Sequence, residues 1–315
     1  MADSGRTDYF RLMIVRPRPS ALGLLFIMRG SVVPTIAPRV LLVLAVSAAV
    51  AWFHRLYPQH FHDLTPAPFT LLGLALSIFL GFRNNASYER WWEARKQWGQ
   101  LIAETRGLVR EGITLLPADP ALRRRCAYRA IAFAHALHNQ LRGTESPDLR
   151  EWLPEGEWDR VARHRSYADG VLLAQADELR ALLQDRKLSG MTYRVFSDRL
   201  QAMSNIQTAC ERLRSTPMPF TYTLLLHRTA WLFCLLLPFG LVTTLGMVTP
   251  LTTAILAYAF FGLDALGEEL EEPFGVSQNA VPLDALVRAI EIAALDSLGE
   301  TDVPPPLQPR EFMLL

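Results

Sequence analysis

The sequence PFTLLGLALSIFLGFRNNASYERWWEARKQW, residues 68–98, decides the fold. Its first half, up to Phe82, has no charged residue, whereas its second half combines Arg, Glu and Lys with Trp. The uncharged part would span about 22 Å as a helix, less than the roughly 30 Å hydrocarbon core of a bilayer. The helical pattern continues past Phe82 into the charged half without an early Gly or Pro. One long helix that leaves a membrane at Arg83 is therefore predicted.

Further apolar blocks predict three more membrane-spanning helices. Residues 36–56 reach the roughly 20 residues that a helix needs to cross a bilayer, and residues 229–248 contain no charge. Pro238 inside the second of these blocks predicts a kink. Because only a Thr-Pro pair separates this block from residues 251–267, the last two helices are expected to form an antiparallel hairpin.

The composition is typical of a membrane protein with a polar part. Half of the 315 residues are hydrophobic, 20% are charged, and the mean hydropathy is +0.14. The 32 Lys and Arg residues nearly balance the 31 Asp and Glu residues, which excludes a strongly basic nucleic-acid-binding chain. The 3 cysteines are widely spaced without a C-x-x-C pair, so neither a disulfide framework nor a zinc site is predicted.

Arginine placement orients the predicted helices. Arginines are concentrated before the first span and after the second, and Arg228 precedes the third, so both termini and residues 84–219 are expected in the cytoplasm. Apolar residues at helical spacing predict an all-helical 84–219 segment, and residues 283–298 predict one more amphipathic helix. The expected divisions are an N-terminal cytosolic segment (1–35), two membrane helices (36–82), a cytosolic helical domain (83–219), two further membrane helices (220–267) and a C-terminal cytosolic helix and tail (268–315).

Three motifs lie directly after the second span and around the third and fourth: FRNNASYERWWEARKQW (82–98), STPMPFTYTLLLHRT (215–229) and LDALGEELEEPFGVSQNAVPLD (263–284). Together they resemble the bestrophin family, specifically its bacterial branch, and the resemblance covers nearly the whole chain in order. It implies an all-α integral membrane protein: a homopentameric ion channel with four membrane helices per subunit, a helical cytosolic domain and a central pore lined by the second helix.

Leu74, Ile78 and Phe82 share one face of the second helix because they are spaced four residues apart. Around a five-fold axis they would make three stacked apolar rings, a constriction that gates by loss of water. The resemblance implies that the neck of the pore lies at these positions. The alternative is that they pack against neighbouring helices, which is the usual role of an apolar stripe.

Asp264 is the only acidic residue inside a predicted span. A charged group there costs about 3 kcal/mol on insertion scales and normally has a partner or a function. Arg228 lies at the same end of the preceding antiparallel helix, so an ion pair between Arg228 and Asp264 is expected, with a role in ion permeation as the alternative.

Acidic residues near the predicted pore favour cations, because rings of acids select them. Asp63 lies at the outer start of the second helix, and glutamates are concentrated between residues 268 and 272. The bacterial branch implies cation preference, whereas animal members resemble chloride channels. The expected function is a passive, cation-preferring channel for monovalent ions in the bacterial inner membrane, whose partners are further copies of the chain and lipid. An anion channel of the same fold, a secondary transporter and a non-conducting scaffold are the alternatives.

Calcium control is not expected. Calcium-gated members of the family carry an acidic run directly after a Pro-Phe-Gly string, whereas Gly275 is followed here by the acid-free segment 276–279, Val-Ser-Gln-Asn. Uncharged side chains are weak ligands for calcium, which requires several hard oxygen ligands.

The remaining patterns predict no enzyme, metal site or cofactor. His135 and His138 have a spacing that can bind metal, but no further ligand at suitable spacing joins them, so a packed or solvated pair is favoured. Trp91, Trp92 and Trp98 among basic residues could stack nucleic-acid bases, yet their position after a span favours an interface belt and helix packing, with no nucleic-acid partner. The sequence contains no nucleophile elbow, P-loop, dinucleotide fingerprint or HExxH motif.

Overall fold

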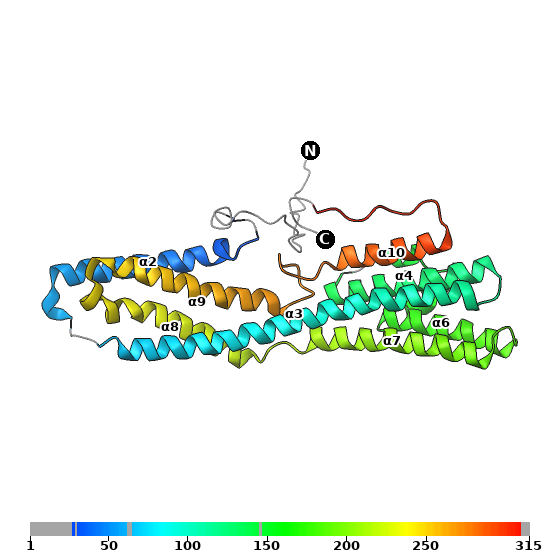
Figure 1. Cartoon of the computed structure of the whole chain (residues 1–315), viewed down its shortest axis with the longest axis horizontal. Coiled ribbons are helices and arrows are strands. Elements are labelled where there is room, and N and C mark those ends of the chain that lie inside the picture. Colours follow the sequence, from blue (N-terminus) through cyan, green and yellow to red (C-terminus); the bar gives the residue numbers. More distant parts are fainter. Residues whose placement is uncertain (1–26, 29, 62–64, 145–146, 310–315) are drawn as a thin grey trace. The chain divides into compact units, whose positions relative to one another are not determined.

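The computed structural model describes residues 27–28, 30–61, 65–144 and 147–309, and every regular element in these ranges is a helix (Figure 1). This confirms the all-α prediction, whereas Asp63 lies outside the described residues. The longer helices are α2 (Val33–Leu56), α3 (Ala67–Leu115), α4 (Pro120–Arg142), α6 (Tyr167–Gln184), α7 (Gly190–Ser215), α8 (Phe220–Leu245), α9 (Thr249–Glu271) and α10 (Leu283–Leu298). The short ones are η1 (Pro58–His60), η2 (Pro147–Glu151), α5 (Glu157–Val161) and η3 (Gly246–Val248).

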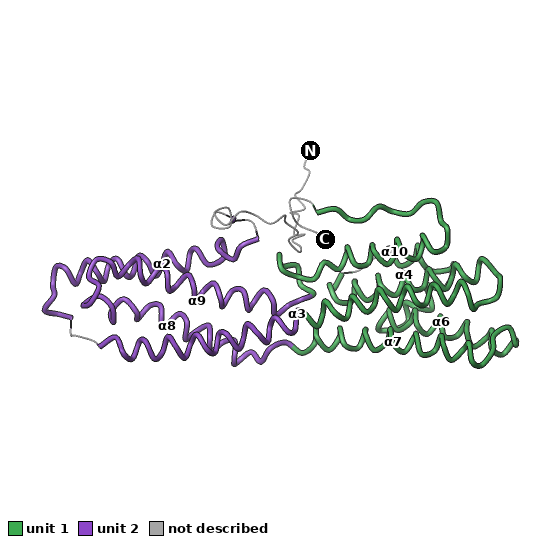
Figure 2. The backbone as a smooth tube through the Cα atoms, viewed as in Figure 1, with its two compact units in different colours: residues 1–15, 92–216, 274–315 green, residues 16–91, 217–273 purple. Residues whose placement is uncertain are grey.

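Helix α3 is continuous over 49 residues, which confirms that the apolar and charged halves of residues 68–98 form one helix. The chain divides into two compact units, and α3 contributes to both (Figure 2). Unit 2 contains α2, the part of α3 up to Trp91, α8 and α9. Unit 1 contains α3 from Trp92 onward, the helices α4 to α7, and α10.

Proline and glycine set the helix ends in unit 2. α2 and α9 each have a proline in their first turn, where its missing N–H costs nothing. α8 passes through Pro238 as one helix and ends at Gly246, whose φ of 51° lies in the left-handed region that favours glycine. Only η3 separates α8 from α9, so the two helices follow each other directly and lie side by side, as the hairpin prediction requires (Figure 1).

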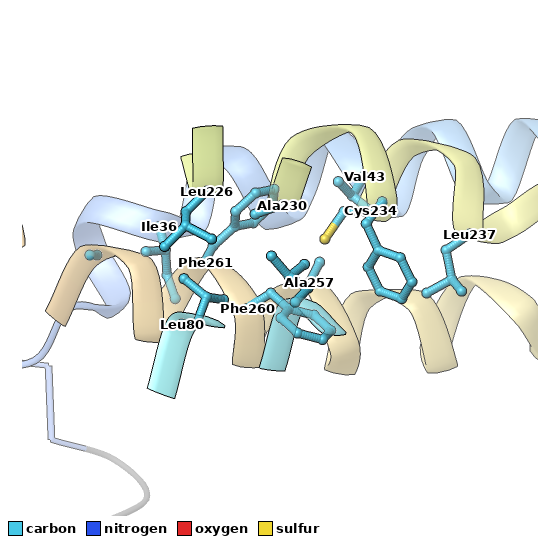
Figure 3. Close-up of a cluster of buried hydrophobic side chains, with 13 residues drawn as sticks. Ile36, Val43, Leu80, Leu226, Ala230, Cys234, Leu237, Ala257, Phe260 and Phe261 are labelled. Atoms are coloured by element: carbon cyan, nitrogen blue, oxygen red, sulfur yellow. The ribbon is translucent and has the colours of Figure 1, made fainter. Parts of the chain in front are cut away.

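The core of unit 2 is apolar and receives side chains from all four of its helices (Figure 3). Ile36 of α2, Leu80 of α3 and Phe261 of α9 are fully buried in it. Glycines bring α3 close to α8: a Cβ on Gly240 would lie 2.4 Å from the ring of Phe69. A large ring packed directly on the helix backbone at a glycine increases van der Waals contact, which drives helix association where lipid removes the hydrophobic driving force.

Unit 1 is a bundle of amphipathic helices with polar caps. Asp119 accepts hydrogen bonds from the backbone N–H groups of Ala121 and Leu122 at 2.9 and 3.3 Å, which begins α4, and α4 ends at the left-handed Gly143. Serine side chains cap α6 and α7 in the same way. The helix predicted for residues 283–298 is observed as α10, which packs against α4.

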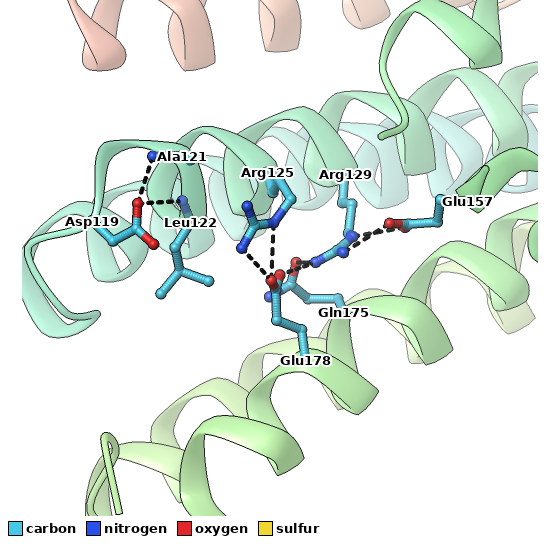
Figure 4. Close-up of polar contacts among 8 residues, drawn as sticks. All are labelled: Asp119, Ala121, Leu122, Arg125, Arg129, Glu157, Gln175 and Glu178. Carbon is cyan, nitrogen blue, oxygen red and sulfur yellow. Dashed lines mark hydrogen bonds and ion pairs between the residues drawn. The ribbon is translucent and has the colours of Figure 1, made fainter. Parts of the chain in front are cut away.

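A buried guanidinium joins α4 to α5 and α6 (Figure 4). Arg129 is 6% exposed, donates to both carboxylate oxygens of Glu157 at 2.8 Å, and pairs with Glu178. Burial by itself would lower the pKa of Arg129, but these two glutamates outweigh it and raise the pKa above its ordinary value. Arg129 is therefore a permanently charged group that links α4 to α5 and α6 within unit 1.

The three cysteines are free and buried. Burial raises the pKa of Cys126 and that of Cys210 to about 12, so both remain protonated thiols at neutral pH. They are structural residues.

Gly240→Ala is expected to destabilise unit 2 by about 1–3 kcal/mol, because the added methyl group must displace the Phe69 ring. Gly190→Ala is the control, since a Cβ added at Gly190 would have no other atom within 4 Å. Thermal unfolding of both purified variants in one detergent measures the difference. Equal unfolding midpoints would contradict the close packing of α3 on α8.

Candidate functional site

Helix α3 carries an exposed apolar stripe. Leu74, Ile78 and Phe82 are 59%, 48% and 64% exposed in the single chain. Leu76 and Leu80, on the opposite face, are 2% and 0% exposed and belong to the unit 2 core. The stripe therefore takes little part in holding α3 to α2, α8 and α9, and it is available to face lipid, another copy of the chain or a pore.

Arg83 ends the uncharged run of α3 and lies buried on the core side of the helix. It is 1% exposed, and its Nη1 donates to Oδ1 of Asp264 at 2.7 Å and to the backbone oxygen of Asp264 at 3.3 Å. Its Nη2 lies 3.5 Å from Oε2 of Glu271. Because Asp264 is only 2% exposed, this is a buried ion pair that links α3 to α9.

His227 of α8 contacts the same carboxylate. Its Nδ1 lies 2.7 Å from Oδ2 of Asp264, and Nε1–H of Trp231 donates to its Nε2 at 3.2 Å. Since an indole N–H can only donate, Nε2 must accept, which assigns the imidazole proton to Nδ1 and its hydrogen bond to Asp264. Arg39 of α2 lies 3.8 Å from the same Oδ2. One carboxylate on α9 thus meets side chains from α2, α3 and α8.

The structure corrects the expected pair between Arg228 and Asp264. Arg228 is exposed, because it lies about 100° around α8 from His227, the residue that does face Asp264. The true partner, Arg83, is 181 residues away in sequence. The available signal was that Arg83 is the first charge after the apolar run of α3. Its direction around the helix could be known only once α9 was placed beside it.

The end of α9 is tied to α3 by further contacts. The backbone oxygen of Glu271 accepts from Nε of Arg90 at 2.8 Å, about two helix turns beyond Arg83. A Cβ on Gly267 would lie 2.4 Å from Oδ1 of Asn84, so the two helices approach closely here as well. These contacts hold α3 in one rotational setting relative to α9.

The acid-free segment after Gly275 is held by α4. Arg142 donates through Nη1 to the backbone oxygen of Gly275 and through Nη2 to that of Val281 at 3.3 Å. Burial lowers the pKa of Arg142, and the neighbouring Asp284 carboxylate partly offsets this effect. The guanidinium of Arg142 therefore binds the backbone at both ends of this segment.

His135 and His138 fasten α4 to α10. Nε2 of His135 lies 2.6 Å from Oε1 of Glu291, and Nε2 of His138 lies 2.6 Å from Oδ1 of Asp284. Burial alone would raise the pKa of Asp284, but His138 with help from Arg142 and His135 outweighs it and holds the pKa below its ordinary value. Across the described ranges, no group of three or more His, Cys, Asp and Glu side chains could hold a metal ion.

The tryptophans after the apolar run take different positions. Trp98 is fully buried in unit 1, where it cannot stack a nucleic-acid base. Trp91 stacks on Tyr88 with ring centroids 6.1 Å apart, and Trp92 is 47% exposed. Helix packing therefore accounts for Trp98.

Long apolar helices joined to a polar helical unit define a helical membrane protein, and comparison with known proteins gives its family. Residues 13–296 match the family model described as Bacterial/Fungal Bestrophin protein. The crystal structure of a bacterial bestrophin homologue from Klebsiella pneumoniae is 41% identical, with a TM-score of 0.81, and the match covers 84% of this chain and 99% of that chain. The chain belongs to the bestrophin family of ion channels, which confirms the resemblance of its motifs.

Two relatives carry names that concern the ion. A voltage-dependent anion channel-forming protein of Mesorhizobium japonicum is 46% identical over 95% of this chain and 96% of its own length. The voltage-dependent anion channel-forming protein YneE of Escherichia coli K12 is 43% identical over 96% of this chain and 100% of its own length. These names fit the anion alternative better than the expected cation preference.

Asp264→Asn is expected to destabilise the protein by about 3–5 kcal/mol, because it removes the shorter of the two ion pairs of the buried Arg83 guanidinium and leaves only the 3.5 Å contact with Glu271. Arg228→Gln is the matched control and should change stability by no more than about 0.5 kcal/mol, as is usual for an exposed residue. Unfolding of both variants in one detergent, followed by tryptophan fluorescence, measures the two effects. Comparable losses in both variants would mean that Arg228 also supports Asp264.

The low pKa of Asp284 predicts pH-dependent stability. A carboxylate whose folded pKa lies below its unfolded value stabilises the fold above about pH 4, and this contribution is lost as the pH falls through the folded pKa. Asp284→Asn should therefore lower the unfolding midpoint near neutral pH, and its difference from the wild type should shrink below about pH 4. Unfolding midpoints of both proteins over this range provide the test. A difference that stays constant with pH would exclude an ionic contribution from Asp284.

Proposed function

We propose that this chain assembles as a homopentameric channel that conducts monovalent ions passively across the bacterial inner membrane. The observation that carries the proposal is the exposed stripe of Leu74, Ile78 and Phe82 on a helix whose other face is buried, in a member of an ion-channel family. Around a five-fold axis these positions form apolar rings about 6 Å apart along α3. Apolar rings offer an ion no replacement for its water, so they form the neck that limits the current.

Helix lengths support four membrane crossings per subunit. In the described part of the chain, the stretches long and apolar enough to cross are Val33–Leu56, Ala67–Leu115 and Phe220–Glu271. The last has 52 residues, and a helix of that length measures about 78 Å, more than twice the hydrocarbon thickness. Since η3 interrupts it near its middle, it crosses twice, as α8 and α9. Arginine placement then puts both termini and unit 1 in the cytoplasm, within the divisions expected from the sequence.

We assign the pore a preference for monovalent cations. Apolar rings alone do not distinguish the sign of an ion, so fixed charges nearby must do so. Asp63 precedes α3 in the sequence, and Glu268 and Glu272 are exposed at the end of α9, so the proposal places acidic residues on both sides of the neck. The second candidate is an anion channel of the same fold, which the names of the two relatives support.

A secondary transporter or a non-conducting scaffold is the alternative from another class. Transporters of known type have interrupted helices that meet at a site near the bilayer midplane. Here α3 is continuous and α8 passes through Pro238 without a break, which favours a channel. Discrete current steps from purified protein in a planar bilayer would identify a channel, and saturable uptake without such steps would identify a transporter.

Calcium has no role in this proposal. The segment 276–279 carries no carboxylate, and the guanidinium of Arg142 already binds the carbonyl oxygens of Gly275 and Val281 at its two ends. Because Arg142 already holds this segment, its position does not depend on bound calcium.

Truncating Leu74, Ile78 and Phe82 together to Ala tests the neck. Because lumen-facing side chains bury little surface against protein, the triple variant should remain a pentamer and give larger currents than the wild type. If the three residues were buried at helix contacts, each truncation would cost about 2–5 kcal/mol and the assembly would weaken. Detergent-corrected mass and single-channel conductance are measured on the same sample. A dissociated or silent protein would place the pore elsewhere.

The ion preference is tested by reversal potentials in a potassium chloride gradient. The wild-type potential should lie toward the potassium equilibrium value, and Asp63→Asn should move it toward the chloride value, because the variant removes negative charge at the outer mouth. A wild-type potential that follows the chloride gradient would replace the cation assignment with the anion alternative.

A further inference from the structure

The exposed face of α3 continues beyond Phe82, where it becomes polar. Glu89 follows Phe82 by seven residues, which places it about 10 Å further along the helix and within about 20° of Phe82 around it. Asn85 lies between them, about 60° from Phe82. Both side chains are exposed in the single chain, as Phe82 is. Glu89 is therefore the first charged residue on the face that carries the apolar stripe.

The carboxylate of Glu89 accepts a hydrogen bond from a neutral amide and has no basic partner in the described residues. Nδ2 of Asn85 donates to its Oε1 at 3.0 Å, which orients the group without neutralising it. No salt bridge joins Glu89 to a basic side chain in the ranges that the structure describes. By contrast, Glu93, one turn further, lies 2.7 Å from Nζ of Lys96, and the adjacent Arg90 donates to α9.

We propose that Glu89 is the residue of α3 that determines which sign of ion the pore prefers. Five Glu89 carboxylates would form an acidic ring on the cytoplasmic side of the Phe82 ring, attracting monovalent cations to the inner end of the neck and repelling anions. This inference rests on the proposed pentamer with α3 around its axis, and it adds the residue that gives an apolar neck its selectivity.

The field of the Glu89 ring must reach the inner end of the neck. The ring lies about 10 Å from Phe82, slightly more than one Debye length of roughly 8 Å at physiological ionic strength, so bulk salt alone would weaken its field there. Walls of protein focus the field of like charges and raise the local concentration of counter-ions above that of bulk water. Glu268 and Glu272 lie on or just after α9, a different helix, so they do not follow the stripe. Glu89 is thus the acid best placed to act on ions that enter or leave the neck.

Reversal potentials in asymmetric potassium chloride test the proposal. Glu89→Gln should lower the cation-to-anion permeability ratio several-fold, Glu89→Lys should shift it further toward anions, and Glu89→Asp should keep it close to the wild-type value. The effects should decrease at high salt, where screening is stronger. Glu93→Gln is the control on the same helix: it removes the same charge about 16 Å from Phe82, about two Debye lengths away, so it should change the ratio much less than Glu89→Gln does.

Chemical modification of an assembled channel removes any effect of folding. The three native cysteines are buried, so Glu89→Cys introduces the accessible thiol. An anionic thiosulfonate reagent should restore the wild-type ratio, and a cationic one should shift the ratio toward anions. Wild-type current steps together with an unchanged ratio in Glu89→Gln, or after both reagents, would overturn the role of Glu89 while leaving the channel intact. Absence of current steps from the wild-type protein would instead overturn the proposed function.

Discussion

The buried pair between Arg83 and Asp264 fixes the rotation of α3, and the exposed face of that helix depends on it. An unpaired guanidinium in an apolar environment is costly, so α3 cannot turn Arg83 away from α9 without losing its partner. With Arg83 directed into unit 2, residues far from it around the helix face outward. Leu74, Ile78, Phe82 and Glu89 lie between about 100° and 180° from Arg83 around α3, and all four are exposed.

Different interactions stabilise the interior of each unit. Unit 2 relies on apolar side chains and on close helix approach at glycines such as Gly240, with one charged cluster at its polar end. Unit 1 uses buried guanidinium groups: Arg129 braces α4 against α5 and α6, and Arg142 holds the segment after Gly275. This division matches the change of α3 from an apolar to a charged helix at Arg83.

The sequence predicted the elements more completely than their contacts. A continuous helix through Phe82 and Arg83 followed from an apolar run without a helix breaker, and α10 was predicted with the observed bounds. The ion pair was predicted with the wrong partner, since nearness to Asp264 in the hairpin favoured Arg228. The histidines were recognised as a helix-face pair, but not their carboxylate partners on α10.

The sequence by itself determined the helices and their apolar lengths. It also contains the acid-free segment after Gly275 and the motifs that identify the bestrophin family. These features depend on residues a few positions apart, whose hydrogen bonding and hydropathy act within one helix. The tertiary structure alone decided that Arg83 meets Asp264 across 181 residues, that Arg142 binds the carbonyl groups of the 275–281 segment, and which face of α3 remains exposed. Such pairings depend on how helices rotate and pack against one another, and helical periodicity leaves that rotation open until a partner helix is in place.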